Sequence, residues 1–253
     1  MHYPLVRIKM PDSPNESIAQ IYDSLAHWYA EREGINEFLT MPLVQHYCPP
    51  GAKSALEVCC GVGRNAIELS KRVESVWGID LSHEMIATAL RQSEASANPP
   101  HFVEGDLLKH DFGGQTFDYV YGAYFITYFD TDTLFRKMIS LTHSGSRLFI
   151  FDGLLGPGQG KFRVVDILRQ ARGYVRFMRQ HGMPADYVGW FLYRLKRRAF
   201  LVSNDWKRVE RWKRERSTAV TKTTWGERFR EMLPDAKIEY ITPRQACAVW
   251  DRK

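Results

Sequence analysis

The 253-residue sequence has few cysteines and no long apolar run. Its four cysteines form no Cys-x-x-Cys pair, and Cys59 and Cys60 would point to opposite faces of a strand. We therefore interpret all four as reduced thiols and expect no metal site. No apolar run reaches the about 18 residues needed to cross a bilayer, and residues 1–7 lack a signal-peptide core. These absences predict a cytoplasmic protein.

Hydrophobic residues make up 44% of the chain, which is enough to bury one α/β core that carries insertions. We therefore expect a single domain over residues 1–253. Prolines at positions 4, 11 and 14 predict an irregular N-terminal arm. Asn15 or Ser17 is suited to cap the helix that follows, because their side chains accept hydrogen bonds from free N–H groups.

The most informative stretch is a strand, a glycine turn, a helix start and a second strand. Residues 55–59 and 76–79 are the expected strands, and Gly61 and Gly63 form the turn between the first strand and the helix. Glycines let the backbone turn sharply and approach a ligand, and a helix start directs free N–H groups at the same place. Asp80 can accept hydrogen bonds from ribose hydroxyls, so the stretch predicts a nucleoside-cofactor site.

Strands and helices continue to alternate after Asp80, which indicates a parallel sheet with helices on both faces and ligands at the carboxyl ends of the strands. A helix capped by Ser82 follows the second strand. The further strands are expected at residues 101–103, 119–122 and 147–151, with a helix at 134–141, and a terminal hairpin at 237–242 and 246–250. The fold class is therefore α/β and Rossmann-like, with a seven-stranded, mostly parallel sheet, a C-terminal antiparallel hairpin and a helical lid insertion.

The chain from about Ile18 to Asp152 resembles the class I S-adenosylmethionine-dependent methyltransferases. The resemblance rests on the order of an acid before the glycine loop, an acid ending strand two, and Gly-Asp after strand three. It implies that Glu57 and the two glycines hold the methionine part of the cofactor and that Asp80 holds the ribose. Asp106 and Leu107 would read the adenine. Cys59 stands where the family most often has its first glycine, and a thiol is accommodated there if it points into the sheet.

The same resemblance implies contacts to S-adenosylmethionine from residues that flank these motifs. Residues 1–50, an arm with helices, would lie over the cofactor site. The full set expected to bind the cofactor is Tyr22, Tyr29, Glu57, Cys59, Gly61, Gly63, Arg64, Asn65, Asp80, Leu81, Met85, Asp106, Leu107, Ala123 and Tyr124.

The implied reaction moves a methyl group from the sulfonium to an oxygen, nitrogen or carbon of a small acidic or aromatic metabolite. The protein mainly has to orient the reactants and exclude water, and a base is needed only if the nucleophile carries a proton. The catalytic candidates are Tyr128, Tyr22, Asp152 and His27. Each also has an ordinary interpretation: packing tyrosines, a turn-capping aspartate and a surface histidine.

Residues 153–217 form a basic insertion, which we expect to be a helical lid over the substrate. The insertion holds 16 Lys or Arg and five Asp or Glu, although the net charge of the whole chain is only +6. Its basic charge would attract an acidic substrate, but arginines on one helical face are also typical of solvated surface. A membrane surface is less favoured as a partner, and nucleic acid is the weakest. The arginines that share a helical face are Arg169, Arg172, Arg176 and Arg179, and an apolar wall for the substrate is expected from Tyr124, Phe125, Trp190 and Phe191.

Two other functions remain open on the sequence. An NAD-dependent oxidoreductase would explain the glycine turn and Asp80, but it leaves Glu57, Asp106 and the terminal hairpin unexplained. A non-methylating protein that binds S-adenosylmethionine would keep every cofactor residue and differ only in the pocket. The sequence indicates neither the methyl acceptor nor the oligomeric state.

Overall fold

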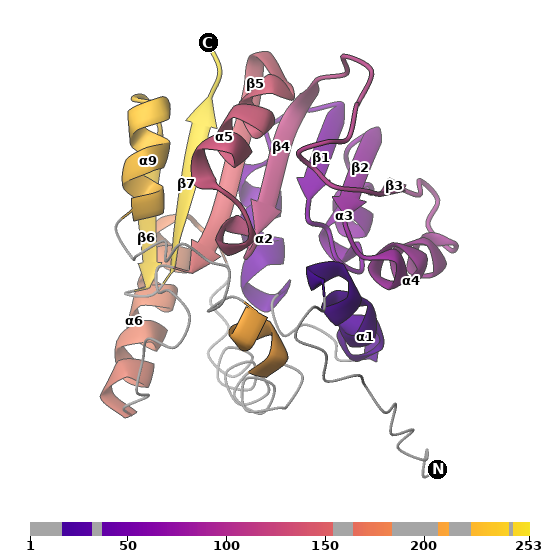
Figure 1. The fold of residues 1–253 in the computed structure, drawn as a ribbon. Helices are drawn as coiled ribbons and strands as arrows, with labels where there is room; N and C mark the ends of the chain where they lie inside the picture. Colours follow the sequence, from indigo (N-terminus) through magenta and orange to yellow (C-terminus); the bar gives the residue numbers. More distant parts are fainter. Residues whose placement is uncertain (1–16, 32–36, 154–163, 184–206, 213–223, 243–244) are drawn as a thin grey trace.

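The computed structural model describes residues 17–31, 37–153, 164–183, 207–212, 224–242 and 245–253 (Figure 1). Within these residues, seven strands form one sheet in the order β3-β2-β1-β4-β5-β7-β6. They are β1 (Ser54–Val58), β2 (Ser75–Asp80), β3 (His101–Glu104), β4 (Phe117–Ala123), β5 (Thr142–Gly153), β6 (Lys237–Thr242) and β7 (Gln245–Asp251). Strand β1 pairs in parallel with β2 and β4, β2 pairs in parallel with β3, and β4 with β5. Strand β7 runs antiparallel to β5 and β6. The predicted sheet and its terminal hairpin are confirmed.

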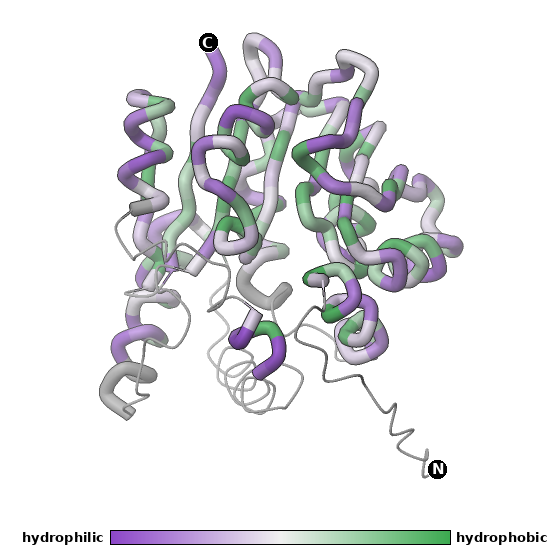
Figure 2. The backbone as a smooth tube through the Cα atoms, in the orientation of Figure 1, coloured by the Kyte–Doolittle hydropathy of each residue, from purple (hydrophilic) through white to green (hydrophobic). Residues whose placement is uncertain are grey.

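Helices cover both faces of the sheet, because successive strand residues point to opposite sides. Tyr119 and Tyr121 of β4 join one apolar cluster, and Val120 joins the other. Helices α5 (Thr131–Ser140) and α9 (Thr224–Met232) pack on the Val120 side. The opposite cluster contains side chains of α1 (Ile18–Glu31), α2 (Glu37–Tyr47), α3 (Arg64–Leu69), α4 (His83–Ser93) and α6 (Val164–Gln180). Figure 2 shows the hydrophobic residues concentrated in the strands between these layers.

Two of the helices begin where polar side chains satisfy free backbone N–H groups. Ser17 Oγ accepts from Gln20 N at 3.3 Å, and Gln20 Oε1 accepts from Ser17 N at 2.9 Å, which is a capping box at the start of α1. The predicted cap at Ser82 accepts from Met85 N at 3.2 Å. The other predicted cap, Asn15, lies outside the described residues.

Helix α9 is not predicted from the sequence. Its Trp225 and Phe229 lie four positions apart and are fully buried, and the Phe229 ring packs on Phe135 of α5 with 5.0 Å between centroids. The burial of these two rings therefore comes from a neighbouring helix that the local pattern does not specify. In the part of the chain that the structure covers, no helix combines the length and apolarity required for a membrane span.

The basic insertion is described in two parts, α6 and a short helix at residues 207–212. This short helix lies beyond the carboxyl ends of the parallel strands, toward which their arrowheads point in Figure 1, and α1 lies at the same end. Arg208 Nη1 donates to Ser24 Oγ of α1 at 3.3 Å, and Val209 is fully buried. The insertion therefore contacts α1 at the end of the sheet where ligands bind in such folds.

Candidate functional site

The turn after β1 begins with a residue in a left-handed backbone conformation. Cys59 has φ 54°, a region that costs a residue with a Cβ about 1–2 kcal/mol and that glycine adopts freely. The side chain packs against the apolar cluster on the Val120 side of the sheet. Burial raises the pKa of the Cys59 thiol well above its ordinary value, and the carboxylates of Asp80 and Glu57 raise it further. Cys59 is therefore an uncharged thiol whose backbone occupies a position suited to glycine.

The two glycines of this turn face different surroundings. A Cβ added at Gly63 would lie 2.4 Å from the Phe102 ring and 2.8 Å from the Ala89 methyl, so packing against the protein requires that glycine. A Cβ added at Gly61 would meet the Met85 sulfur at 4.0 Å. Space for the close approach of a ligand is therefore found at Gly61, whereas the sequence analysis assigns it to both glycines.

Asp80 at the end of β2 ties the neighbouring turns together. Its Oδ2 accepts from Gly61 N at 2.8 Å, and its Oδ1 accepts from Ser82 N at 3.0 Å. Burial raises the pKa of this carboxyl, although the N–H donors favour the charged form and oppose that shift. A carboxylate has about four acceptor positions, and the backbone N–H groups of Ser82, Gly61 and Leu81 interact with this one, so at least one position is left for a ligand hydroxyl.

Asp106 lies at the end of the next strand, as the sequence predicts. Strand β3 pairs with β2 so that Glu104 lies opposite Asp80, and Gly105 N donates to the Asp80 carbonyl oxygen at 2.9 Å. Asp106 Oδ1 accepts from Leu108 N at 3.0 Å. Both acids are also close enough to Cys59 to raise the pKa of its thiol. The glycine turn and the two predicted acids therefore lie at one edge of the sheet.

Three apolar residues of the predicted cofactor set surround these acids. Leu107 and Met85 are buried, at 3% and 2% exposed, whereas Leu81 directly after Asp80 is 44% exposed. The exposed Leu81 beside Asp80 offers an apolar surface to a flat ring.

Glu57 is buried and is hydrogen-bonded to the start of α3. Its carboxylate accepts from Asn65 Nδ2 at 2.8 Å and from Ala66 N at 3.0 Å, and Tyr121 Oη donates to it at 3.4 Å. Thr40 Oγ1 of α2 donates to Asn65 Oδ1 at 3.4 Å. A carboxylate at a helix N-terminus is favourable because it meets free N–H groups and the positive end of the helix dipole. Glu57 and Asn65 therefore hold the helix that follows the turn.

Helix α1 is held over this turn at two points. Arg64 Nη2 donates to the carbonyl oxygens of Ala30 at 2.7 Å and Tyr29 at 3.3 Å, where a cation also meets the negative end of the α1 dipole. Asp23 Oδ1 accepts from Ser82 Oγ at 2.6 Å and Glu84 N at 3.1 Å at the start of α4. Arg64 thus anchors α1, and the sequence analysis misses Asp23 because nothing in the local sequence shows its distant partners.

Four aromatic side chains, which we call the aromatic wall, lie close together: Tyr22 and Tyr29 of α1, Tyr128 and Trp212. Tyr22 and Tyr128 are hydrogen-bonded through their hydroxyls, with 5.8 Å between ring centroids. Tyr29 lies 6.3 Å from Tyr22, and Trp212 of the insertion lies 6.1 Å from Tyr128. Burial raises the pKa of both Tyr22 and Tyr128 well above the ordinary value, so both hydroxyls keep their protons at neutral pH. These tyrosines are therefore placed as neutral hydrogen-bonding groups.

The other two catalytic candidates differ in their placement. Asp152 is 5% exposed, and its carboxylate accepts from Ile126 N at 2.8 Å and from Gly153 N at 2.6 Å. It thereby fixes the turn η1 (Ile126–Tyr128). His27 lies away from the aromatic wall: its side chain is 81% exposed and pairs with Glu31 at 3.0 Å. The physical reason is helical geometry, since five positions along α1 rotate His27 by about 140° from Tyr22.

At the end of β4, Ala123 pairs with Phe151, and the next residue, Tyr124, has φ 59°. Tyr124 Oη accepts from Gln245 Nε2 of β7 at 2.7 Å. The sequence predicts a role for Tyr124 but does not indicate Gln245 or Trp212, because no motif distinguishes these two from other residues of their segments.

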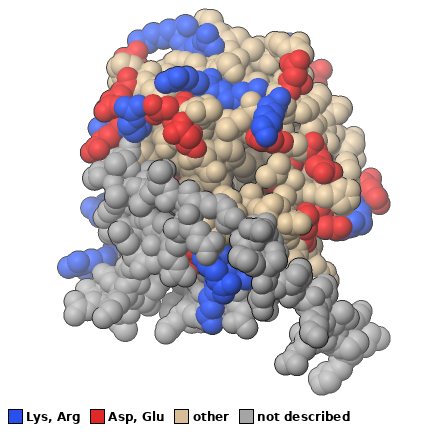
Figure 3. Space-filling view, viewed as in Figure 1, with Lys and Arg blue, Asp and Glu red and all other residues tan. Residues whose placement is uncertain are grey.

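The basic face of α6 is solvated along its described length. Arg169, Arg172, Arg176 and Arg179 are all exposed, opposite the buried Val175 and Met178. Trp190 and Phe191 lie outside the described residues. On the face shown in Figure 3, the described Lys and Arg side chains alternate with Asp and Glu.

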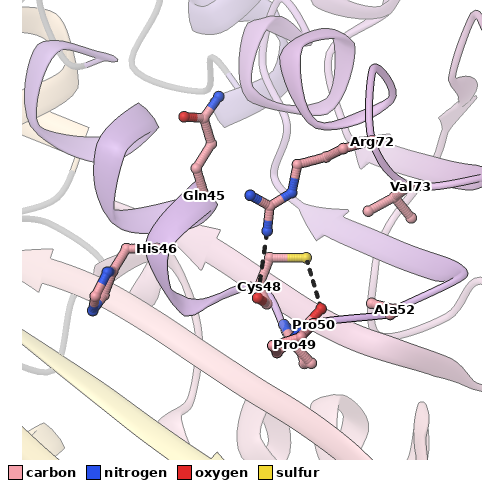
Figure 4. Close-up of a pocket in the computed structure, with 9 residues that line it drawn as sticks. Gln45, His46, Cys48, Pro49, Pro50, Ala52, Arg72 and Val73 are labelled. Atoms are coloured by element: carbon pink, nitrogen blue, oxygen red, sulfur yellow. Dashed lines mark hydrogen bonds between the residues drawn. The ribbon is translucent and has the colours of Figure 1, made fainter.

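A pocket of about 370 Å³ lies at the opposite edge of the sheet (Figure 4). It is lined by Gln45, His46, residues 48–52, Arg72 and Val73, and Arg72 donates to the Cys48 carbonyl oxygen at 3.4 Å. Residues 49–52 precede β1, so the pocket is at the amino ends of the strands. It is therefore separate from the site at the carboxyl ends. The described residues contain no group of three or more His, Cys, Asp or Glu able to hold a metal.

Comparison with known proteins agrees with this geometry. Residues 55–145 match a family model described as a methyltransferase domain. A 2-phytyl-1,4-naphtoquinone methyltransferase of Trichormus variabilis is 32% identical over 108 residues, covering 41% of this chain and 46% of the relative. A phosphoethanolamine N-methyltransferase of Triticum aestivum is 29% identical over 127 residues, covering 49% of this chain and 25% of the relative. The chain thus spans less than half the length of these curated relatives.

The fold has counterparts among solved structures. The complex of DhpI with S-adenosylhomocysteine superposes with a TM-score of 0.55 at 16% identity, covering 92% of this chain and 97% of that chain. The domain match covers the strands and turns that carry the glycine loop, Asp80 and Asp106. Residues 55–145 are therefore similar to a methyltransferase domain, on a fold shared with a complex of S-adenosylhomocysteine.

Proposed function

We propose that this chain binds S-adenosylmethionine at the carboxyl ends of β1, β2 and β3 and transfers its methyl group to a small molecule. The observation that carries the proposal is the hydrogen bond between Asp80 and Gly61. It places a carboxylate that can accept from ribose hydroxyls next to the glycine whose Cβ position is open. Asp106 and the exposed Leu81 flank the position proposed for the adenine. In this proposal, residues 1–50 cover the cofactor and residues 153–217 form the lid over the acceptor.

The proposed acceptor is a flat, aromatic molecule. The aromatic wall offers ring faces and edges to such a ligand, and offset or edge contacts between rings contribute about 0.5–1.5 kcal/mol each beyond area burial. The name of one relative, 2-phytyl-1,4-naphtoquinone methyltransferase, describes an acceptor of this kind. An acidic acceptor is the second candidate, favoured by the net basic charge of residues 153–217.

When bound, S-adenosylmethionine supplies an electrophilic methyl carbon. The chain's own groups then orient and enclose the reactants: Asp80 and the turn at Gly61 fix the nucleoside, and α1 excludes water from above. Tyr22 and Tyr128 stay protonated and share a hydrogen bond, and both oxygens of Asp152 accept from backbone N–H groups. Neither tyrosine is a base at neutral pH, which favours an acceptor that is nucleophilic once its own hydroxyl has ionised.

Titration calorimetry with S-adenosylhomocysteine and with NADH tests the cofactor. We expect S-adenosylhomocysteine to bind and NADH not to bind. Asp80→Asn should weaken the affinity by about 1–3 kcal/mol, because a neutral amide accepts fewer hydrogen bonds at a partly buried position. Glu104→Gln is the matched control, an exposed acid on the next strand. Binding of NADH alone would indicate an oxidoreductase.

Methyl transfer needs a separate measurement. Incubation with methyl-labelled cofactor and a panel of small phenols and hydroquinones should give a labelled product. A chain that binds S-adenosylhomocysteine tightly but labels nothing in the panel or in a metabolite extract would be a non-methylating binder.

A further inference from the structure

Tyr124 occupies a costly backbone conformation directly after β4. Its φ of 59° lies in the left-handed region, which costs of order 1–3 kcal/mol for a residue with a side chain. Strand β4 pairs with β1 so that Gly122 lies opposite Val58, and the residue after Val58 is the left-handed Cys59. Two neighbouring central strands therefore both end in strained residues at the edge that carries the site.

Three contacts hold Tyr124 in this conformation. Its backbone N–H donates to the Phe151 carbonyl oxygen of β5 at 2.9 Å, and its ring packs edge-on against the Phe151 ring at 5.0 Å. Its hydroxyl accepts from Gln245 Nε2 of β7 at 2.7 Å. The Gln245 side chain is itself oriented, because Thr242 Oγ1 of β6 donates to Gln245 Oε1 at 3.3 Å. Gln245 and Thr242 are 8% and 3% exposed, so this polar chain runs through a buried part of the hairpin.

A buried glutamine amide is expensive unless it is hydrogen-bonded, so a side chain in this position has a defined orientation. The ring that Gln245 fixes is partly buried and packs around the same apolar cluster as Tyr22, Tyr29 and Trp212. We propose that Gln245 is a positioning residue that holds Tyr124 as one side of the acceptor site, so that the C-terminal hairpin helps to determine which flat molecules fit. This inference rests on the proposed function, since it assigns the acceptor to the space beside the aromatic wall.

Fluorine NMR of protein labelled with 3-fluorotyrosine tests the inference without an activity assay. Tyr124→Phe assigns the Tyr124 resonance. Gln245→Leu and Thr242→Val should shift or broaden that resonance, and Gln245→Glu should restore it in part, because its carboxylate can accept from the Tyr124 hydroxyl. Thr142→Val is the matched control. Thr142, the first residue of β5, is also a buried threonine, 2% exposed, and its hydroxyl donates to the Ile139 carbonyl oxygen of α5. An unmoved Tyr124 resonance in both Gln245→Leu and Thr242→Val would overturn the positioning role.

The acceptor part is tested by adding 1-naphthol, a flat and unreactive probe, to the complex with S-adenosylhomocysteine. The Tyr124 resonance should shift in the wild-type protein, and Gln245→Leu should bind the probe about tenfold more weakly, the size of one net hydrogen bond. Affinity for S-adenosylhomocysteine should stay within about twofold, since Gln245 lies on β7 and the proposed function places the cofactor at the carboxyl ends of β1, β2 and β3. A resonance that does not respond to 1-naphthol contradicts the inference. Failure of the wild-type protein to bind S-adenosylhomocysteine would instead count against the proposed function, while the spectra without ligand still decide the role of Gln245.

Discussion

The Asp80 carboxylate accepts a hydrogen bond from the Gly61 backbone N–H at 2.8 Å, and this bond joins the end of β2 to the turn after β1. The two residues that the sequence assigns to separate parts of the cofactor are therefore one structural unit. Removing the Asp80 side chain would release the turn as well as the proposed ribose contact. A substitution that keeps one acceptor oxygen, such as Asp80→Asn, is for this reason a better probe than Asp80→Ala.

Substitutions at the two glycines should separate binding from stability. Gly63→Ala places a Cβ against Phe102 and Ala89, so we expect the free energy of unfolding to fall by about 1–3 kcal/mol from overpacking, with more from the left-handed φ of 74°. Gly61→Ala costs about 1–2 kcal/mol of strain but directs its methyl into open space, so it should mainly reduce affinity for S-adenosylhomocysteine. Urea unfolding and calorimetry measure the two effects, and equal losses of affinity without a loss of stability in Gly63→Ala would contradict this division.

Cys59→Gly should be close to neutral for stability. Relief of the left-handed strain raises the free energy of unfolding by about 1–2 kcal/mol, and the greater conformational freedom of glycine in the unfolded chain lowers it by about 0.5–1 kcal/mol. Cys60→Gly is the control, because Cys60 is 8% exposed and φ is not left-handed there, so that change should only destabilise. If thermal unfolding shows Cys59→Gly to be as damaging as Cys60→Gly, strain at position 59 is not significant.

Arg64→Ala should loosen α1 without unfolding the sheet. The guanidinium donates to two carbonyl oxygens at the end of α1, and hydrogen bonds from a charged group contribute about 1.5–3 kcal/mol. Hydrogen exchange should therefore accelerate in residues 18–31 and stay unchanged in β4 and β5. Arg91→Ala serves as the comparison, since Arg91 bonds Thr88 within its own helix. Unchanged exchange in α1 would show that its other contacts, through Tyr22, Asp23 and Ser24, hold the helix without Arg64.

Acid should weaken the packing of α6 on the sheet through Glu239. Its carboxylate lies 2.8 Å from His181 Nε2 and 2.6 Å from Lys237 Nζ, and Tyr47 Oη donates to it at 3.2 Å. Burial would raise the pKa of this carboxyl, but the Lys237 and His181 contacts outweigh it and leave the pKa below its ordinary value of 4.5. A depressed folded-state pKa gives stability that is present above pH 4.5 and is lost as pH falls through the lower folded value.

The free energy of unfolding of the wild-type protein should therefore decline below pH 4.5, and Glu239→Gln should show a shallower decline from a lower starting value. Glu104→Gln, which changes an exposed acid, should leave the wild-type slope intact. Parallel curves for wild type and Glu239→Gln would rule out this contribution.

Replacing Arg169, Arg172, Arg176 and Arg179 by glutamine should leave the Michaelis constant of an aromatic acceptor unchanged. All four side chains are exposed, and at 0.15 M salt the charge of a solvated side chain is screened beyond about 8 Å. A salt-sensitive increase in the Michaelis constant at low ionic strength would favour the acidic acceptor.

The sheet was predictable because local patterns specify it. Apolar runs bounded by glycines and acids predict the strands, and alternation with helices predicts parallel pairing. Even the hairpin at the C-terminus follows from two short runs joined at Pro243. Helix α9 was not predictable in the same way, since burial of Trp225 and Phe229 against the other elements decides it.

The sequence by itself determined the glycine turn, the acid that ends β2 and the acid that follows β3, because each of these depends on residues close together in the chain. The meeting of Tyr22 with Tyr128, which are 106 positions apart, is a tertiary contact. Tertiary structure alone decided that Gly63 packs inward while Gly61 faces open space, that His27 points to solvent, and that Gln245 reaches Tyr124. These outcomes depend on contacts between segments far apart in sequence, such as β7 with β4, and local periodicity carries no information about which distant side chain fills a given space.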